Sequence, residues 1–242
     1  MQSRNFRLQK VGNLGWLERN YKFKSIAFSL DELIVLNATK SNKSIREFAS
    51  VVSSLVNDVF IPIAAGGGIR SMDDAELLFN SGADKIVLNS VLFQDINLVT
   101  SLVKRYGSQS IVASIDYKIN NGTHEVYIND GNTKCNLNLD DYLIYLEELE
   151  IGEIYLNSID RDGTGFGYDF ATIEKYNSRI KTPLIIAGGA GNEMHFKEGL
   201  QYDNVSAVAT ANLFNFIGDG LPNARNKLIA SKENIANWKL NS

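Results

Sequence analysis

The chain has 242 residues, of which 44% are hydrophobic, and its formal net charge is −4 at pH 7. This size suits one large buried core, so we expect residues 1–242 to form a single α/β barrel domain, and the acidic balance argues against nucleic acid as a partner. One cysteine excludes an internal disulfide framework, and no apolar run is long enough to span a membrane, so we expect a cytoplasmic protein without membrane contact.

Short β-branched runs alternate with longer segments of helical period, which indicates βα units around a parallel sheet. The expected strands are 32–37, 61–65, 85–89, 111–117, 153–158, 184–188 and 206–210. The expected helices are 14–28, 44–57, one that begins after Ser71, 96–106, 139–150, 170–180 and 193–200. Asn121-Gly122 predicts a hairpin within the loop that follows the strand at 111–117.

The strand-end segments of the first half recur in the second half at a constant spacing. Glu32 and Glu153 are 121 residues apart, and so are Pro62 and Pro183. A constant spacing across separated blocks predicts two copies of one half-fold, as in a (β/α)8 barrel. Only seven of the eight strands can be counted, and the counterpart of Asp116 would fall before residue 1. We therefore expect either a shortened barrel or a misplaced start.

Each half carries a glycine-rich turn between a strand and a helix. These turns contain Gly67 and Gly68 in the first half, and Gly188 and Gly189 in the second. Glycines there let an anion approach backbone N–H groups, and a helix N-terminus adds positive potential. The neighbouring strand ends, Asn89-Ser90 and Ala211-Asn212, would complete each phosphate cradle. Two cradles at one barrel mouth predict a long substrate with a phosphate at each end.

Acidic residues at strand ends are the other candidates for chemistry. Asp116 ends its strand, where it is either a general acid or base or a group that positions a loop or binds a hydroxyl. Asp162-Gly163 either presents N–H groups to a phosphate or belongs to a mobile loop. Charges at the opposite strand ends most often form a structural salt-bridged layer; here they are Glu32, Lys85 and Glu153.

The remaining reactive residue types predict no further site. His124 and His195 are expected at the surface, Cys135 is not expected to be a nucleophile, and Trp16 and Trp238 are expected to pack. No spacing resembles a metal site or a nucleotide-binding Walker loop, so we expect no metal and no cofactor.

Four blocks together carry a resemblance to a known family. They are Ile61-Pro-Ile-Ala-Ala-Gly-Gly-Gly-Ile-Arg-Ser, Gly82-Ala-Asp-Lys-Ile-Val-Leu-Asn-Ser, Asp160-Arg-Asp-Gly-Thr and Ile186-Ala-Gly-Gly-Ala-Gly-Asn. In these blocks the chain resembles the cyclase subunit of imidazole glycerol phosphate synthase, HisF, over about residues 10 to 216. The resemblance implies a lyase of histidine biosynthesis. A HisH-type glutaminase would supply ammonia through the barrel, and a bisphosphorylated ribulosyl aminoimidazole carboxamide nucleotide would be cleaved and cyclised.

The resemblance also implies roles for individual residues. Asp116 matches one of two acid–base aspartates. The phosphate contacts carry over to Gly67, Gly68, Asn89 and Ser90 at one site, and to Asp162, Gly163, Gly188, Gly189, Ala211 and Asn212 at the other. The family's ammonia gate carries over to Glu32, Lys85 and Glu153, and Asp84 would face the glutaminase.

Several family positions differ in this chain. The strand with the other catalytic Asp, a gate Arg and a loop lysine has no counterpart, and Asn37, Asn157 and Asn212 replace the usual Asp, Thr and Ser. Three hypotheses follow. The chain forms imidazole glycerol phosphate, or it delivers ammonia for nucleotide-sugar amidination in surface polysaccharide synthesis, or it is a non-catalytic phosphate-binding scaffold. The asparagines slightly favour ammonia delivery over the first.

Overall fold

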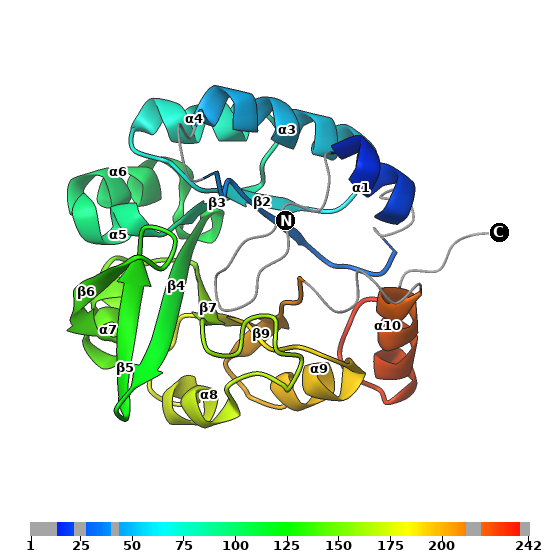
Figure 1. Ribbon diagram of the computed structural model, residues 1–242. Helices are drawn as coiled ribbons and strands as arrows, with labels where there is room; N and C mark the ends of the chain where they lie inside the picture. Colours follow the sequence, from blue (N-terminus) through cyan, green and yellow to red (C-terminus); the bar gives the residue numbers. More distant parts are fainter. Residues whose placement is uncertain (1–13, 22–27, 40–43, 212–218, 238–242) are drawn as a thin grey trace.

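The computed structural model describes residues 14–21, 28–39, 44–211 and 219–237, and its strands and helices alternate along most of the chain (Figure 1). The strands are β1 (Leu33–Leu36), β2 (Ile63–Gly66), β3 (Lys85–Leu88), β4 (Ile111–Asn120), β5 (Thr123–Ile128), β6 (Thr133–Asn138), β7 (Glu153–Ser158), β8 (Leu184–Ala187) and β9 (Val205–Val208). The helices are α1 (Leu14–Tyr21), α3 (Ile45–Asp58), α4 (Met72–Asn80), α5 (Ser90–Gln94), α6 (Ile96–Tyr106), α7 (Leu139–Glu148), α8 (Phe170–Asn177), α9 (Glu193–Gly199) and α10 (Gly220–Ala230).

Seven strands pair in parallel, in the order β1-β2-β3-β4-β7-β8-β9, and this sheet curls inside a ring of helices (Figure 1). The α/β barrel-type fold and its seven parallel strands are therefore as predicted. Within the described residues, β1 and β9 stand at the two ends of the ladder, and no eighth parallel strand occurs. A parallel sheet brings the carboxyl ends of its strands to one rim, which is where barrel enzymes carry their chemistry.

The internal repeat is visible in the strand register. Leu36 pairs with Gly66 in the first half, and Asn157 pairs with Ala187 in the second, so both partners are displaced by the same 121 residues. The equivalence breaks at β9. Leu184 pairs with Val205, but Ile185 pairs with Ala207, so one residue is inserted as a bulge.

The hairpin predicted at Asn121-Gly122 is present. Both residues have positive φ, 48° and 78°, and they join β4 to β5. β6, α5 and α10 were not predicted from the sequence. α10 is held to the segment before β1 by Arg225, whose guanidinium nitrogens donate to the two carboxylate oxygens of Asp31 at 2.9 and 2.8 Å. Of the helix expected at 14–28, residues 14–21 form α1 and Phe28 lies in a turn instead; residues 22–27 are outside the described part.

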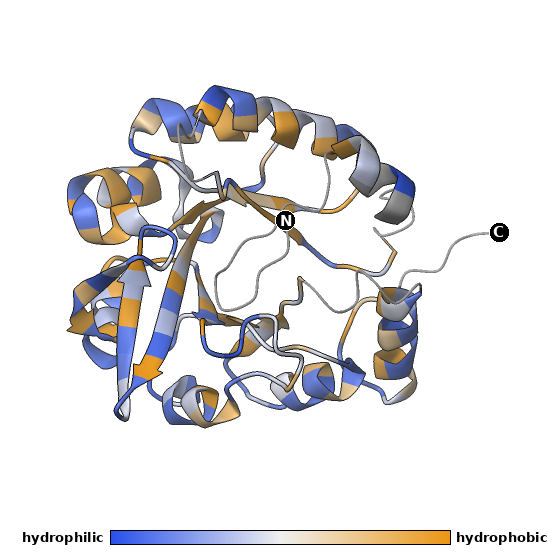
Figure 2. Cartoon of the chain, in the orientation of Figure 1, coloured by the Kyte–Doolittle hydropathy of each residue, from blue (hydrophilic) through white to orange (hydrophobic). Residues whose placement is uncertain are grey.

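Most residues of the parallel strands are hydrophobic, whereas hydrophilic and hydrophobic residues alternate along the helices (Figure 2). The larger core lies between the sheet and the helices and includes Ile86, Leu88, Ile115 and Leu156. A smaller cluster lies on the inner face; it consists of Ala64, Val87, Val112 and Ile185, with Ile34, Tyr155, Ala207 and Ala209 packed against it. Apolar side chains thus predominate in the middle of the interior.

Period-two alternation places three kinds of residue in layers along the inner face. On β3 the inward residues run from Lys85 through Val87 to Asn89, and on β7 they run from Glu153 through Tyr155 to Asn157. The amino-terminal ends of the strands are therefore charged inside, the middle is apolar, and the carboxyl ends are polar.

Asp84 fastens β3 to β2 where both strands begin. Its carboxylate accepts a hydrogen bond from the N–H of Ile63 at 2.8 Å, and its own N–H donates to the carbonyl of Ile63 at 2.8 Å. The side chain therefore has a structural role whether or not it also faces a partner protein.

We expect Asp84→Ala to lower the free energy of unfolding by about 1–3 kcal/mol, because the Ile63 N–H loses its acceptor. Urea denaturation measures this. Asp203→Ala, at an exposed turn residue, is the matched control and should change stability by less than about 0.5 kcal/mol. Equal stability of the two variants would contradict the fastening role.

Candidate active site

A cavity of about 940 Å³ opens at the carboxyl rim of the sheet. It gathers residues from both sequence halves. Those predicted from the sequence are Gly67, Gly68, Asn89, Ser90, Asp116, Asp162, Gly163, Gly188, Gly189 and Ala211. Asn212, the remaining predicted phosphate contact, lies outside the described residues. One cavity therefore brings together ten residues that are spread over 145 positions of the chain.

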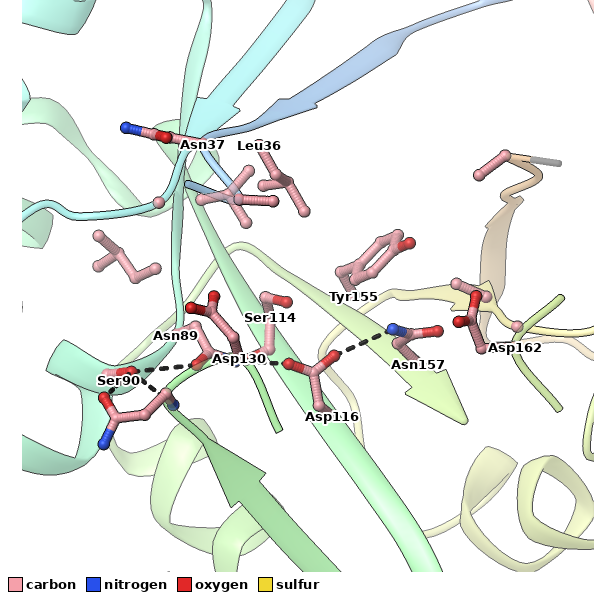
Figure 3. Close-up of a pocket in the computed structure, with 18 of the residues that line it drawn as sticks. Leu36, Asn37, Asn89, Ser90, Ser114, Asp116, Asp130, Tyr155, Asn157 and Asp162 are labelled. Carbon is pink, nitrogen blue, oxygen red and sulfur yellow. Dashed lines mark hydrogen bonds between the residues drawn. The ribbon is translucent and has the colours of Figure 1, made fainter. Parts of the chain in front are cut away.

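Asp116 is buried at the floor of this cavity, held by two amide groups (Figure 3). Asn157 Nδ2 donates to one carboxylate oxygen at 3.0 Å, and Asn89 Nδ2 donates to the other at 3.1 Å. Burial raises the pKa of the Asp116 carboxyl to about 7, the two amide hydrogen bonds oppose the rise, and Asp130 and Asp162 add to it. A carboxyl with a pKa near neutrality suits proton transfer.

The first glycine turn follows β2 and lines the cavity beside β1 and β3. Gly67 and Gly68 have φ of 97° and 96°, which side chains rarely adopt. A Cβ on Gly67 would also stand 2.6 Å from the backbone oxygen of Asn37. The turn therefore needs glycine both for its conformation and for its close approach to the end of β1.

The second glycine turn has the same geometry and an additional neighbour. Gly188 and Gly189 have φ of 88° and 104°. The loop after β7 lies directly against them, since the N–H of Gly167 donates to the carbonyl of Gly189 at 2.8 Å. A Cβ on Gly189 would stand 2.1 Å from the oxygen of Gly167. This contact holds the Asp162-Gly163 segment at the cavity.

The charged residues at the opposite end of the sheet form one cluster. Lys85 Nζ lies 2.9 Å from Glu32 Oε2 and 2.6 Å from Glu153 Oε2. All three side chains are only partly exposed, at 20–26%. Burial raises the pKa of Glu32 against the opposing effect of Lys85, and the pKa of Lys85 is raised by the two carboxylates against the effect of burial. The cluster is separated from the cavity by the apolar middle layer.

Some residues that line the cavity were not predicted from the sequence. The turn between β5 and β6 contributes Asn129, Asp130 and Asn132. The segment between the first glycine turn and α4 contributes Arg70. The run Asn129-Asp130-Gly131-Asn132 has the composition of a turn, so the turn itself could have been predicted. Its place over the cavity follows only from the pairing of β5 with β4.

Neither histidine is among the residues that line the cavity. His124 is half-buried, and its Nε2 lies 2.8 Å from Thr172 Oγ1. His195 Nδ1 accepts from the N–H of Gly191 at 3.0 Å. His195 is likewise half-buried, so both rings are partly covered and partly exposed. Cys135 is a buried free thiol whose pKa is raised by burial, Trp16 is half-buried, and Trp238 is outside the described residues.

Comparison with known proteins shows the family of this chain. The family model of histidine biosynthesis proteins matches residues 21–218, which is most of the chain and includes both glycine turns and Asp116. The chain belongs to the histidine biosynthesis protein family. A search of the described part of the chain finds no helix whose length and hydropathy would let it span a membrane, and no group of three or more His, Cys, Asp or Glu placed to hold a metal ion.

Individual members of this family are similar over most of their length. The chain is 42% identical over 239 residues to "Putative imidazole glycerol phosphate synthase subunit hisF2" of Parasynechococcus marenigrum (strain WH8102), an alignment that covers 98% of this chain and 89% of the relative. It is 40% identical over 186 residues to the imidazole glycerol phosphate synthase subunit HisF of Pyrobaculum aerophilum, with 77% and 73% covered. For the subunit HisF of Hydrogenobaculum sp. (strain Y04AAS1) the identity is 35% over 193 residues, with 79% and 77% covered.

In this family member we expect Asn157→Ala to raise the pKa of Asp116 above its present value of about 7, because the ionised carboxylate loses a hydrogen-bond donor. Titration of the Asp116 carboxyl carbon by NMR measures the shift directly. Asn204→Ala, which removes an amide that donates only to backbone carbonyls outside the cavity, is the control. An unchanged or lowered pKa in Asn157→Ala would contradict this account.

The close contact between Gly189 and Gly167 should matter for stability. Gly189→Ala should lower stability by about 1–3 kcal/mol more than Gly122→Ala, as measured by thermal unfolding. Both positions have positive φ, but a Cβ meets a backbone oxygen at Gly189 and nothing within 4 Å at Gly122. The comparison therefore isolates the contact with the loop after β7. Similar losses in the two variants would show that this contact is unimportant.

Proposed function

We propose that this chain is the HisF-type subunit of imidazole glycerol phosphate synthase and acts as the cyclase in histidine biosynthesis. The single observation that carries this is Asp116, a buried carboxyl with a pKa near 7, at the floor of a cavity that has a glycine turn on each side. The relatives reported above bear the name of this synthase subunit, which supports the proposal.

The two glycine turns would bind the two phosphates of the substrate. At one side the candidates are Gly67, Gly68, Asn89 and Ser90; at the other they are Asp162, Gly163, Gly188, Gly189, Ala211 and Asn212. Glycines permit close contact between phosphate oxygens and the backbone, and the repeat places equivalent turns in both halves. A bisphosphate held at both ends would lie with its middle over Asp116.

Asp116 would move protons during cleavage and cyclisation of the bisphosphorylated ribulosyl aminoimidazole carboxamide nucleotide. With a pKa near the working pH, its carboxyl exists in both protonation states, so the same group is able to donate and accept a proton. Asn89 and Asn157 hold both carboxylate oxygens, so they would orient the group toward the cavity.

A HisH-type glutaminase would be the partner and would supply ammonia at the amino-terminal end of the sheet. There the cluster of Glu32, Lys85 and Glu153 would act as the gate, and Asp84 lies beside it. Beyond the cluster, the interior is lined by small and apolar side chains, among them Ala64 and Val87, before the polar cavity begins. Neutral ammonia, unlike ammonium, crosses such an apolar layer at little cost in desolvation.

The experiment is cyclisation of the bisphosphate substrate with an ammonium salt, measured for the unchanged chain and for Asp116→Asn. We expect turnover by the unchanged chain and a 10²–10⁴-fold loss in Asp116→Asn, because the amide cannot transfer the proton. Asp203→Asn is the matched control and should retain full activity, since Asp203 is exposed and is not among the residues that line the cavity.

A second arm replaces ammonium by glutamine and a HisH-type glutaminase. Turnover in that arm would support the partner. Absence of cyclisation with either nitrogen source would overturn the cyclase proposal. Stimulated glutaminase without cyclisation would instead leave ammonia delivery to another acceptor as the better hypothesis.

A further inference from the structure

The turn between β5 and β6 is fastened to Ser90, where β3 ends and α5 begins, by reciprocal hydrogen bonds. Ser90 Oγ donates to Asn129 Oδ1 at 3.1 Å, and the N–H of Asn129 donates to Ser90 Oγ at 3.1 Å. Ser90 directly follows Asn89, which holds Asp116. The turn is thus connected to the same strand end that positions the buried carboxyl (Figure 3).

The backbone of this turn is held in an uncommon conformation. Asn129, Asp130 and Gly131 have φ of 54°, 57° and 75°, three left-handed residues in succession. For residues other than glycine this conformation costs on the order of 1 kcal/mol each, although Asn and Asp tolerate it better than most. Such strain concentrates at functional sites, where a side chain must be presented in one direction.

The side chain presented here is the carboxylate of Asp130, which lines the cavity. It lies near enough to Asp116 for its charge to raise the pKa of that group, an effect it shares with Asp162. Among the described residues that line the cavity, the carboxylates are Asp116, Asp130 and Asp162, and the only side chain that is positively charged at all pH values of interest is Arg70.

Within the described lining, carboxylates thus outnumber cations, which is unfavourable for simple binding of an anionic substrate. A carboxylate at the edge of a site for phosphates repels the substrate and weakens its binding. Asp162 is part of the loop that packs against the second glycine turn, whereas Asp130 lines the cavity from the separate turn that Ser90 holds. The position of Asp130 therefore favours a chemical role over a binding role.

We propose that Asp130 is a second acid–base group of this site and works as a pair with Asp116. The proposal rests on the proposed cyclase function. As the new bond to nitrogen forms, one carboxylate accepts the proton that the nitrogen releases. As the bond to the leaving atom breaks, the other carboxyl donates a proton to it, so the protons balance within the pair. Two carboxyl groups in unequal surroundings divide such roles.

The test is the ammonium-dependent cyclisation assay with the bisphosphate substrate and the full chain, applied to Asp130→Asn. Asn favours the left-handed conformation at least as well as Asp, so the variant should fold, and circular dichroism checks this. We expect kcat to fall 10²–10⁴-fold with KM unchanged or lowered, since removing the negative charge does not weaken phosphate binding. Asp203→Asn is the matched control, and Asp130→Glu should restore part of the activity.

The pH dependence of kcat/KM supplies a readout that a merely structural role would not move. The titratable groups that influence or are influenced by Asp116 are Asp130 on the turn, Asp162 on the loop after β7, Tyr155 on β7 and Tyr142 on α7, while Asn89 and Asn157 are neutral. Because the charge of Asp130 raises the pKa of Asp116, the limb due to Asp116 should move to lower pH in Asp130→Asn.

The outcomes separate this inference from the proposed function. Turnover by the unchanged chain together with full activity and an unchanged pH profile in Asp130→Asn would overturn the inference and leave the cyclase function standing. A loss expressed only in KM would also overturn it, because it would make Asp130 a binding residue. No turnover by the unchanged chain would overturn the function, and the pairing with it.

Discussion

Parallel pairing and the two-residue pleat of the strands set the position of the candidate residues at both ends of the parallel sheet. On β3 and β7, inward side chains change from charged at Lys85 and Glu153, to apolar in the middle, to amide at Asn89 and Asn157. A shift of one residue in either strand would turn that strand's charged residue and its amide away from the interior. The glycine turns depend on the same register, since they follow the strands that pair with these.

Equivalent strands in the two halves of the chain pair with the same register. The cavity therefore has a similar glycine turn on each side. The pairs Leu36–Gly66 and Asn157–Ala187 are equivalent, and each is followed by two glycines with positive φ. A ligand with similar groups at both ends fits a site with such symmetry. The buried carboxyl of Asp116 departs from this symmetry, because the described residues contain no first-half equivalent of it, and one amide from each half holds it.

The electrostatics of the cavity favour proton transfer more than tight binding. Burial keeps Asp116 partly protonated near neutrality, while the amides of Asn89 and Asn157 limit how far its pKa rises. The strained turn that carries Asp130 adds negative charge beside it. Burial of an ionisable group costs stability, and groups with shifted pKa values cluster at functional sites.

By itself the sequence determined the parallel strands, most helices, the hairpin at Asn121-Gly122, both glycine turns and the family, because these depend on local periodicity, turn chemistry and the spacing of 121 residues. The roles of the site residues stay predictions. Only the tertiary structure decided that Asn157 donates a hydrogen bond to Asp116 and that the turn at Asp130 lines the cavity. The same holds for the hydrogen bond from the Gly191 N–H to His195. The reason is physical: these contacts join residues far apart in the chain, through strand pairing and loop packing that leave no local pattern in the amino-acid sequence.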